Sequence, residues 1–179
     1  MIVCSDIMRC VILVTSNDLA KISTFMFWRK AFKPSKMEEL TQLQTTPKTI
    51  YIADDEKDIR EAIKTFLESA GYTVRDFENG DSLLKAFFEE PADLVILDVM
   101  MPGSNGFTCC RELREHSHVP IFMLTARDSD LDYQTGLDLG CDGFFTKPVS
   151  PMSLVMRVKA LFRRIAYEWE AAKKEYDRT

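Results

Sequence analysis

The 179-residue sequence lacks a long uninterrupted apolar run and lacks an excess of positive charge. Its N-terminal apolar patch at residues 11–14 is interrupted by Arg9 and Asp18, far short of the roughly 20 apolar residues that a membrane helix needs. A secretory signal would have a longer apolar core and a small-residue cleavage site. The formal net charge is −5, whereas nucleic-acid-binding domains are usually basic. We expect a cytoplasmic protein with no membrane span and no direct contact with nucleic acid.

The sequence also has few metal-binding or disulfide-forming residues in recognisable patterns. Its cysteines are odd in number and none are spaced as C-x-x-C: Cys4, Cys10, Cys109, Cys110 and Cys141. The histidines are His116 and His118, and no further ligands at the spacing of a zinc site are apparent near them. Because disulfide frameworks and zinc sites need regular spacings, we expect reduced thiols and two histidines in a solvated loop.

Glycine and proline are scarce, at 7 residues each, while 46% of the residues are apolar and 28% are charged. This composition excludes fibrous and low-complexity chains and is typical of a globular protein. A chain of this length is long enough for one domain with additional segments.

From residue 49 onward, short apolar segments alternate with segments of helical periodicity, the pattern of βα units. Strands are expected at residues 49–53, 72–76, 93–97, 119–124 and 143–146. The first helix has an apolar stripe and a stop signal at Gly71; the stripe comprises Ile59, Ala62, Ile63, Phe66, Leu67 and Ala70. The mixed second strand suits a sheet edge. We predict an α/β fold, a doubly wound five-stranded parallel sheet in the flavodoxin-like order 2-1-3-4-5.

Polar side chains follow the strands of this sheet at the ends where ligands bind in such folds. Asp54 and Asp55 follow the first strand, Asp98 the third, Thr125 the fourth and Lys147 the fifth. Three converging carboxylates indicate a hard cation, and Mg²⁺ prefers such oxygen ligands. A hydroxyl and an ammonium beside them suit a phosphoryl group. The pattern favours Asp98 as a nucleophile that forms an aspartyl phosphate.

Four motifs in this order resemble the receiver domain of two-component response regulators. They are "IYIADDE", "LVILDVMMPGSNGF", "PIFMLTA" and "GCDGFFTKPVSPMSLVMRVKALFRR". The resemblance implies that Asp98 accepts a phosphoryl group from a sensor histidine kinase, so that the protein is a phosphorylation-dependent switch rather than an enzyme in the usual sense.

The resemblance also implies roles for individual residues. Asp55, Asp98 and the backbone carbonyl of Met100 would hold Mg²⁺, with Mn²⁺ as a possible substitute, and Asp54 would assist through ordered water. Lys147 would pair with the phosphoryl group, and its bond to Pro148 is usually cis in this family. Thr125 and Phe144 match the pair that moves on phosphorylation.

The segments "RVKALFRR" and "LTARDSD" look most like the OmpR-type subfamily, which regulates transcription and dimerises through the fourth helix, fifth strand and fifth helix of the receiver domain. Asp142 and Arg157 match positions that form intersubunit salt bridges there, but Gly143 stands where the family often has a second acid. Such proteins continue into a winged-helix DNA-binding domain. Because this sequence stops at Thr179, we expect it to lack that domain, either as a natively single-domain protein or as a piece cut from a longer transcription regulator.

Each polar residue also has a simpler interpretation. Asp54, Asp55 and Asp98 could cap helices or loops, and Lys147 could be an ordinary surface lysine. Two other classes of function remain open: an adaptor that works without phosphorylation, through protein contacts, and an acid phosphohydrolase. The phosphohydrolase would need a second acid at the position of Met100. The adaptor would have no chemical need for the set of strand-end residues.

The remaining segments lie on either side of the predicted receiver domain at residues 48–164. Residues 1–47 match nothing in the receiver pattern and are expected to be an extension and linker, disordered or non-native, since Met37 is a sensible start; a short helix at residues 22–32 is the alternative. Residues 165–179 are expected to extend the last helix through a near-heptad stripe: Leu154, Val158, Leu161, Ile165, Trp169, Ala172 and Tyr176.

Overall fold

A computed structural model describes residues 47–126 and 130–178 of the chain. The chain divides into two compact units, one formed by Lys48–Arg163 and the other by Met1–Pro47 with Arg164–Thr179. The helix predicted at residues 22–32 and the side chain of Tyr176 lie outside the described part. The first unit contains all the strand-end residues singled out above.

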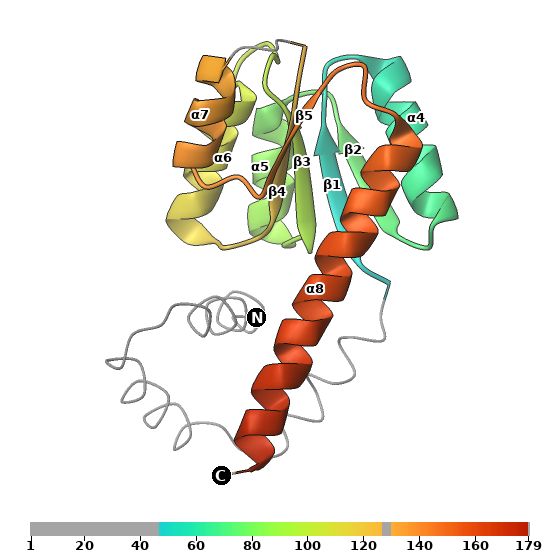
Figure 1. Ribbon diagram of the computed structural model, residues 1–179. Coiled ribbons are helices and arrows are strands. Elements are labelled where there is room, and N and C mark those ends of the chain that lie inside the picture. The colour runs from blue at the N-terminus through green and yellow to red at the C-terminus, as the bar shows by residue number, and fades with distance from the viewer. Residues whose placement is uncertain (1–46, 127–129, 179) are drawn as a thin grey trace. The chain divides into compact units, whose positions relative to one another are not determined.

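The unit Lys48–Arg163 is built on a five-stranded parallel sheet in the order β2-β1-β3-β4-β5, which confirms the predicted fold (Figure 1). The strands are β1 (Thr49–Ala53), β2 (Thr73–Phe77), β3 (Leu94–Asp98), β4 (Ile121–Thr125) and β5 (Gly143–Thr146). The helices are α4 (Lys57–Ser69), α5 (Gly80–Glu89), α6 (Gly106–His116), α7 (Asp130–Asp138) and α8 (Pro151–Asp177). The predicted second, third and fourth strands are displaced by one or two residues, so that Asp98 and Thr125 are the last residues of their strands.

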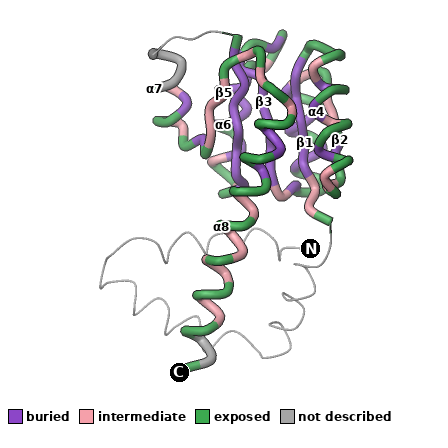
Figure 2. Tube along the Cα trace, turned by 45° about the vertical axis from the view of Figure 1, so that its right-hand side comes forward, coloured by how far each residue is buried: buried purple, intermediate pink, exposed green. Residues whose placement is uncertain are grey.

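Each face of the sheet is covered by helices and has its own hydrophobic core. Leu83 and Phe87 of α5 pack with Leu113 of α6 on one face. Leu67 of α4 packs with Leu154 of α8 on the other. Figure 2 shows the central strand β3 buried along its length, and every residue of β3 and β4 is buried. Helices on both faces account for the nearly continuous apolar runs of these strands.

The apolar stripe of α4 was predicted only in part. Ile63 and Leu67 are buried, but Phe66 is 41% exposed and Ala62 is also exposed. The buried face of α4 includes Arg60 instead. A helix turns about 100° per residue, so a face formed by positions 60, 63 and 67 leaves positions 62 and 66 outside it. A charged residue in the buried face was not anticipated by an apolar pattern.

The thiols of Cys109, Cys110 and Cys141 are buried and free. Burial raises the pKa of Cys109 to about 12 and that of Cys141 to about 11, which makes these side chains unreactive packing groups. His116 ends α6 rather than lying in a loop, and its ring packs edge-on against Phe88 at 5.5 Å.

The loop from β3 to α6 is closed by a glycine. The amide of Gly106 donates a hydrogen bond to the carbonyl of Val99 at 3.2 Å, and a Cβ at position 106 would collide with the carbonyl of Asp98. Asn105 caps α6 by accepting a hydrogen bond from the amide of Thr108. The absence of a side chain therefore lets α6 begin directly beside the end of β3.

Across the described residues, no helix combines the length and the apolar character required to cross a membrane.

Candidate functional site

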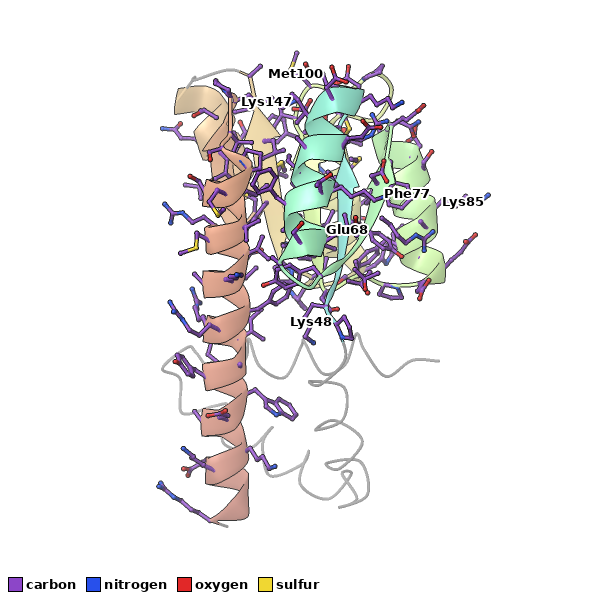
Figure 3. All side chains as sticks on the ribbon, turned by 90° about the vertical axis from the view of Figure 1, so that its right-hand side faces the viewer. Lys48, Glu68, Phe77, Lys85, Met100 and Lys147 are labelled. Atoms are coloured by element: carbon purple, nitrogen blue, oxygen red, sulfur yellow. The ribbon has the colours of Figure 1, made fainter. Side chains whose placement is uncertain are left out.

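The acids predicted at the strand ends are brought together. The carboxylates of Asp54, Asp55 and Asp98 each place an oxygen within 4.8 Å of the others. Asp54 is fully buried and Asp98 is 2% exposed, while Asp55 is exposed. Figure 3 shows Met100 and Lys147 at this end of the sheet, with Lys48 at the opposite end. The parallel arrangement of β1 and β3 is what places the three acids at one edge.

Lys147 lies among these acids. Its Nζ is 2.8 Å from Oδ2 of Asp54, 3.0 Å from Oδ2 of Asp98 and 3.1 Å from Oε1 of Glu56. Burial by itself would lower the pKa of the Lys147 ammonium, but Asp54 and Asp98 outweigh it, so that the pKa is raised. The peptide bond from Lys147 to Pro148 is cis, as the resemblance implied.

Glu56 was not predicted as part of the site. It is the third acid of "IYIADDE", and it precedes α4 as the N-cap residue without making a side-chain cap bond. Its side chain is instead directed to Lys147, 91 residues away in the sequence. The run of three acids was the available signal, but an exposed acid before a helix is usually explained by the helix itself.

Asp98 has the electrostatic setting of a buried nucleophile. Burial raises the pKa of its carboxyl, and the Asp54 carboxylate raises that pKa further, whereas Lys147 and the Met100 amide lower it. That amide donates to Oδ1 of Asp98 at 3.3 Å. The structure thus places the backbone of Met100 beside Asp98; the metal-binding role of its carbonyl stays a prediction.

Thr125 and Phe144 occupy different surroundings. Thr125 is fully buried at the end of β4, and its carbonyl accepts a hydrogen bond from the amide of Lys147 at 2.6 Å. Phe144 is half-buried on β5, where its ring lies against Gly136 of α7: a Cβ on that glycine would be 2.9 Å from two ring atoms. The structure therefore brings Thr125 to the acid site and places Phe144 against the neighbouring helix.

The acid cluster has the donor set that a divalent cation requires. Hard cations such as Mg²⁺ take carboxylate and carbonyl oxygens. Oδ2 of Asp54 is buried and forms an ion pair with Nζ of Lys147 at 2.8 Å. A carboxylate oxygen has acceptor capacity beyond one such contact. The residues present therefore fit Mg²⁺.

The predicted intersubunit residue Asp142 has partners within its own chain. Its Oδ2 accepts hydrogen bonds from Nη2 of Arg114 and from the amide of Ile121, each at 2.9 Å. Arg157 is exposed on α8. Gly143 stands where the family often has a second acid. Its lack of a side chain gives room to the ring pair of Phe122 and Phe145, since a Cβ there would be 2.8 Å from the Phe122 ring.

Comparison with known proteins identifies the family. The model described as response regulator receiver domain matches residues 50–159. The chain is 43% identical over 123 residues to transcriptional regulatory protein GltR of Pseudomonas aeruginosa, covering 67% of this chain and 51% of GltR. It is 41% identical over 121 residues to transcriptional regulatory protein ResD of Bacillus subtilis, covering 68% and 50%. The chain thus spans about half the length of these curated relatives.

Comparison with solved structures supports the same family. The receiver domain of the Francisella response regulator 1452 superposes with a TM-score of 0.63 at 32% identity, covering 66% of this chain and 98% of that one. DrrB, described as a Thermotoga maritima OmpR/PhoB homolog, gives a TM-score of 0.62 at 32% identity, covering 66% and 54%. On the strength of the matching family model and these relatives, the chain belongs to the receiver domains of two-component response regulators.

Proposed function

We propose that the chain is a phosphorylation-dependent signalling switch in which Asp98 accepts a phosphoryl group from a sensor histidine kinase. The observation that carries this proposal is the environment of Asp98: a carboxylate that is 2% exposed, 3.0 Å from a lysine ammonium and within 4.8 Å of two further carboxylates. An acid with only a structural role would have no need of this excess of negative charge around it.

In the proposed transfer, an Asp98 carboxylate oxygen attacks the phosphorus of the donor. A bond forms between that oxygen and phosphorus, the phosphorus–nitrogen bond to the kinase histidine breaks, and the electron pair stays on the leaving imidazole. Lys147 is close enough to Asp98 to balance the charge that accumulates on the phosphoryl oxygens. Raising the pKa of Lys147 keeps it protonated for this role.

Asp55, Asp98 and the backbone carbonyl of Met100 would hold Mg²⁺, or Mn²⁺ in its place, and Asp54 would assist through ordered water. When bound, the cation supplies positive charge to the oxygens of the transferred group. The chain's own residues fix the geometry: Asp54 is held by its burial and by a hydrogen bond from the amide of Glu56 to its Oδ1 at 2.9 Å.

The phosphoryl group adds roughly −1.5 to −2 charge at one point of the sheet edge. We expect the Thr125 hydroxyl to donate to a phosphoryl oxygen and the Phe144 ring to turn further inward, which alters the surface of β5 and α7. The output would then be a change in dimerisation through α7, β5 and α8. Similarity to OmpR/PhoB homologue DrrB and to regulators such as GltR supports an OmpR-type role in transcription control.

In this proposal the receiver domain comprises residues 48–164 and works in the cytoplasm, and residues 165–179 extend its last helix. Its acidic net charge of −5 supports regulation through protein partners instead of direct contact of these residues with nucleic acid.

The test is to incubate the chain with a small acyl phosphate, with and without Mg²⁺, and to measure intact mass and oligomeric state. We expect a single phosphoryl adduct that needs Mg²⁺ and is absent in Asp98→Asn, whereas the exposed helix acid Asp58→Asn serves as a control that keeps it. An adduct that persists in Asp98→Asn would refute the site. An adduct that leaves the oligomeric state unchanged would refute the proposed dimerisation switch.

A further inference from the structure

Arg60 is a buried charge beside Asp54 and Asp55, which are called the acid pair below. The proposed phosphoryl chemistry gives Arg60 no role. Its side chain is 6% exposed, and it lies in the first turn of α4. A cation near a helix N-terminus is opposed by the helix dipole, and a buried charge loses its hydration. Neither helix formation nor core packing therefore explains an arginine at this position.

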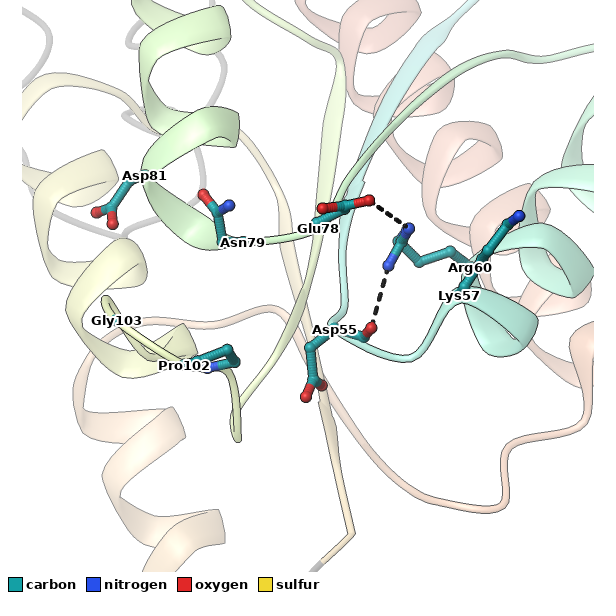
Figure 4. A pocket seen from close by; sticks show the side chains of 8 residues that line it. All are labelled: Asp55, Lys57, Arg60, Glu78, Asn79, Asp81, Pro102 and Gly103. Atoms are coloured by element: carbon teal, nitrogen blue, oxygen red, sulfur yellow. Dashed lines mark hydrogen bonds and ion pairs between the residues drawn. The ribbon is translucent and has the colours of Figure 1, made fainter.

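The contacts of Arg60 lead to the backbone of the acid pair. Its Nη1 donates to the carbonyl of Asp54 at 2.7 Å and to the carbonyl of Asp55 at 3.3 Å. Figure 4 shows the guanidinium between Asp55 and Glu78, at the wall of a cavity of about 580 Å³ that Asp55 also lines. The guanidinium thus holds the main chain that carries both acids.

The other side of the guanidinium faces the end of β2. Its Nε is 3.6 Å from Oδ2 of Asp76, and its Nη2 is 3.7 Å from Oε1 of Glu78. Asp76 is held in turn by Lys64 at 2.7 Å. The planar fork of arginine can serve carbonyls and carboxylates in several directions at once, which a lysine ammonium on a single stem cannot reproduce.

These contacts fix Asp54, the fully buried acid of the cluster. The carbonyl of Asp54 is held by Arg60, and its Oδ1 is held by the amide of Glu56. Both ends of the residue are thereby restrained, and Oδ2 lies in the cluster 2.8 Å from Nζ of Lys147. An oxygen held in this way is prepared for a cation before the cation arrives.

We propose that Arg60 is a positioning residue for the cation site: by binding the carbonyls of Asp54 and Asp55 it orients both carboxylates and so sets the Mg²⁺ affinity of the chain. The inference rests on the proposed function, since it concerns the same site. It adds a residue that is not itself a metal ligand, and it predicts that this residue changes the Mg²⁺ affinity.

The sign of the effect separates positioning from simple electrostatics. If Arg60 acted only as a nearby positive charge, its removal would strengthen Mg²⁺ binding, because the repulsion between the guanidinium and the cation would be lost. If it acted only in folding, removal would lower stability and leave the Mg²⁺ affinity of the folded protein unchanged. Positioning alone predicts weaker binding in a folded variant.

The experiment measures Mg²⁺ binding to the full chain by titration calorimetry, for wild type, Arg60→Met, Arg60→Lys and the control Lys64→Met. Lys64→Met removes the other cation on Asp76, one turn further along α4, without touching the acid pair. We expect about tenfold weaker binding for Arg60→Met, or 1.4 kcal/mol. Arg60→Lys, which keeps the charge but loses the fork, is expected to bind about threefold more weakly than wild type, and Lys64→Met to stay within about twofold.

A second readout uses phosphorylation by a small acyl phosphate at varied Mg²⁺. The half-saturating Mg²⁺ concentration is expected to rise in Arg60→Met by about the same tenfold, while the rate at saturating Mg²⁺ returns to within about twofold of wild type. If circular dichroism shows that Arg60→Met does not fold, Arg60→Lys decides the question by the same criterion.

The proposal is overturned if the folded Arg60 variants bind Mg²⁺ as tightly as wild type or more tightly. That result, with normal Mg²⁺ binding and adduct formation in wild type, removes the positioning role and leaves the proposed function intact. Failure of wild type itself to bind Mg²⁺ overturns both.

Discussion

The two ends of strand β3 each have an aspartate close to a lysine, yet they differ in charge balance and burial. At the start of the strand, Asp93 accepts hydrogen bonds from Lys48 at 3.2 Å and from the amide of Thr49 at 2.8 Å, and both ionic side chains are about one-third exposed. At the other end, the side chains of Lys147 and Asp98 are 8% and 3% exposed. Figure 3 shows the two lysines at opposite ends of the sheet along the strand direction.

The two ends differ in how fully the negative charge is compensated. Asp93 and Lys48 form one balanced ion pair, which is also screened by water. Lys147 is shared among Asp54, Asp98 and Glu56, so a single cation serves three acids. Burial makes such an excess of negative charge costly, and a protein keeps it where a further cation will compensate it. Both Asp93 and Asp98 are aspartates near a strand end, so the local sequence alone does not distinguish the balanced pair from the reactive site.

The largest expected difference between the two ends concerns covalent modification. Asp98→Asn should abolish the acyl phosphate adduct, because an amide oxygen is too weak a nucleophile, whereas Asp93→Asn should be modified at the wild-type rate. Intact mass after a timed incubation measures both. Loss of the adduct in Asp93→Asn would contradict the claim that only the Asp98 end of β3 takes part in phosphorylation.

The next difference concerns the two lysines. Lys147→Met should slow adduct formation by about 100-fold, since electrostatic stabilisation of this kind contributes at that scale. It should also destabilise the fold in metal-free buffer by about 3 kcal/mol through the unpaired buried acids. Lys48→Met should change the rate less than twofold and the free energy of unfolding by less than about 1 kcal/mol. Rates and urea midpoints measured on both variants test this.

The pH dependence of stability should also differ between the ends. Burial raises the folded-state pKa of Asp98 above its ordinary value of 3.8, so the folded protein holds this proton more tightly than the unfolded chain. The stabilisation is fully present below pH 3.8 and is lost as the pH rises through the folded pKa. Asp98→Asn should therefore gain stability relative to wild type over that rise in metal-free buffer. Urea unfolding at stepped pH, with Asp93→Asn as control, measures it; a constant difference would contradict the assignment.

Glu56→Gln should have the smallest effect. The Glu56 side chain is 59% exposed, so its contact with Lys147 is screened by solvent. We expect the rate of adduct formation to change by less than about threefold and the urea midpoint to stay the same within error. A loss comparable to that of Lys147→Met would show that Glu56 belongs to the reacting group.

Much of the fold could be predicted because periodicity reports burial. The apolar runs of β3 and β4 predicted central strands, and the mixed β2 predicted an edge. The site followed from topology, since parallel strands bring Asp54, Asp98 and Lys147 to one edge. Phe66 was misplaced because apolar character does not determine which side of a stripe is buried.

Arg60 and Glu56 were missed for a different reason. Their roles depend on contacts with backbone carbonyls and with a lysine 91 residues away, and neither contact leaves a pattern in the local sequence. A charged residue within an apolar stripe is the one signal that Arg60 gave, and it becomes informative only when the three-dimensional contacts are known.

The closure of the loop by Gly106 has a consequence for how this protein can diversify. Because the chain leaves β3 and returns to it at the hydrogen bond between Gly106 and Val99, the residues between them form a surface loop whose ends are already joined. Loop-closure entropy changes slowly with length, so insertions beside the exposed Pro102 and Gly103 can be accepted without disturbing the sheet. Met101 and Asn105 are not free to vary in this way, because Met101 is buried in the core and Asn105 caps α6. Recognition of a particular donor can thus change while the reacting carboxylate stays fixed.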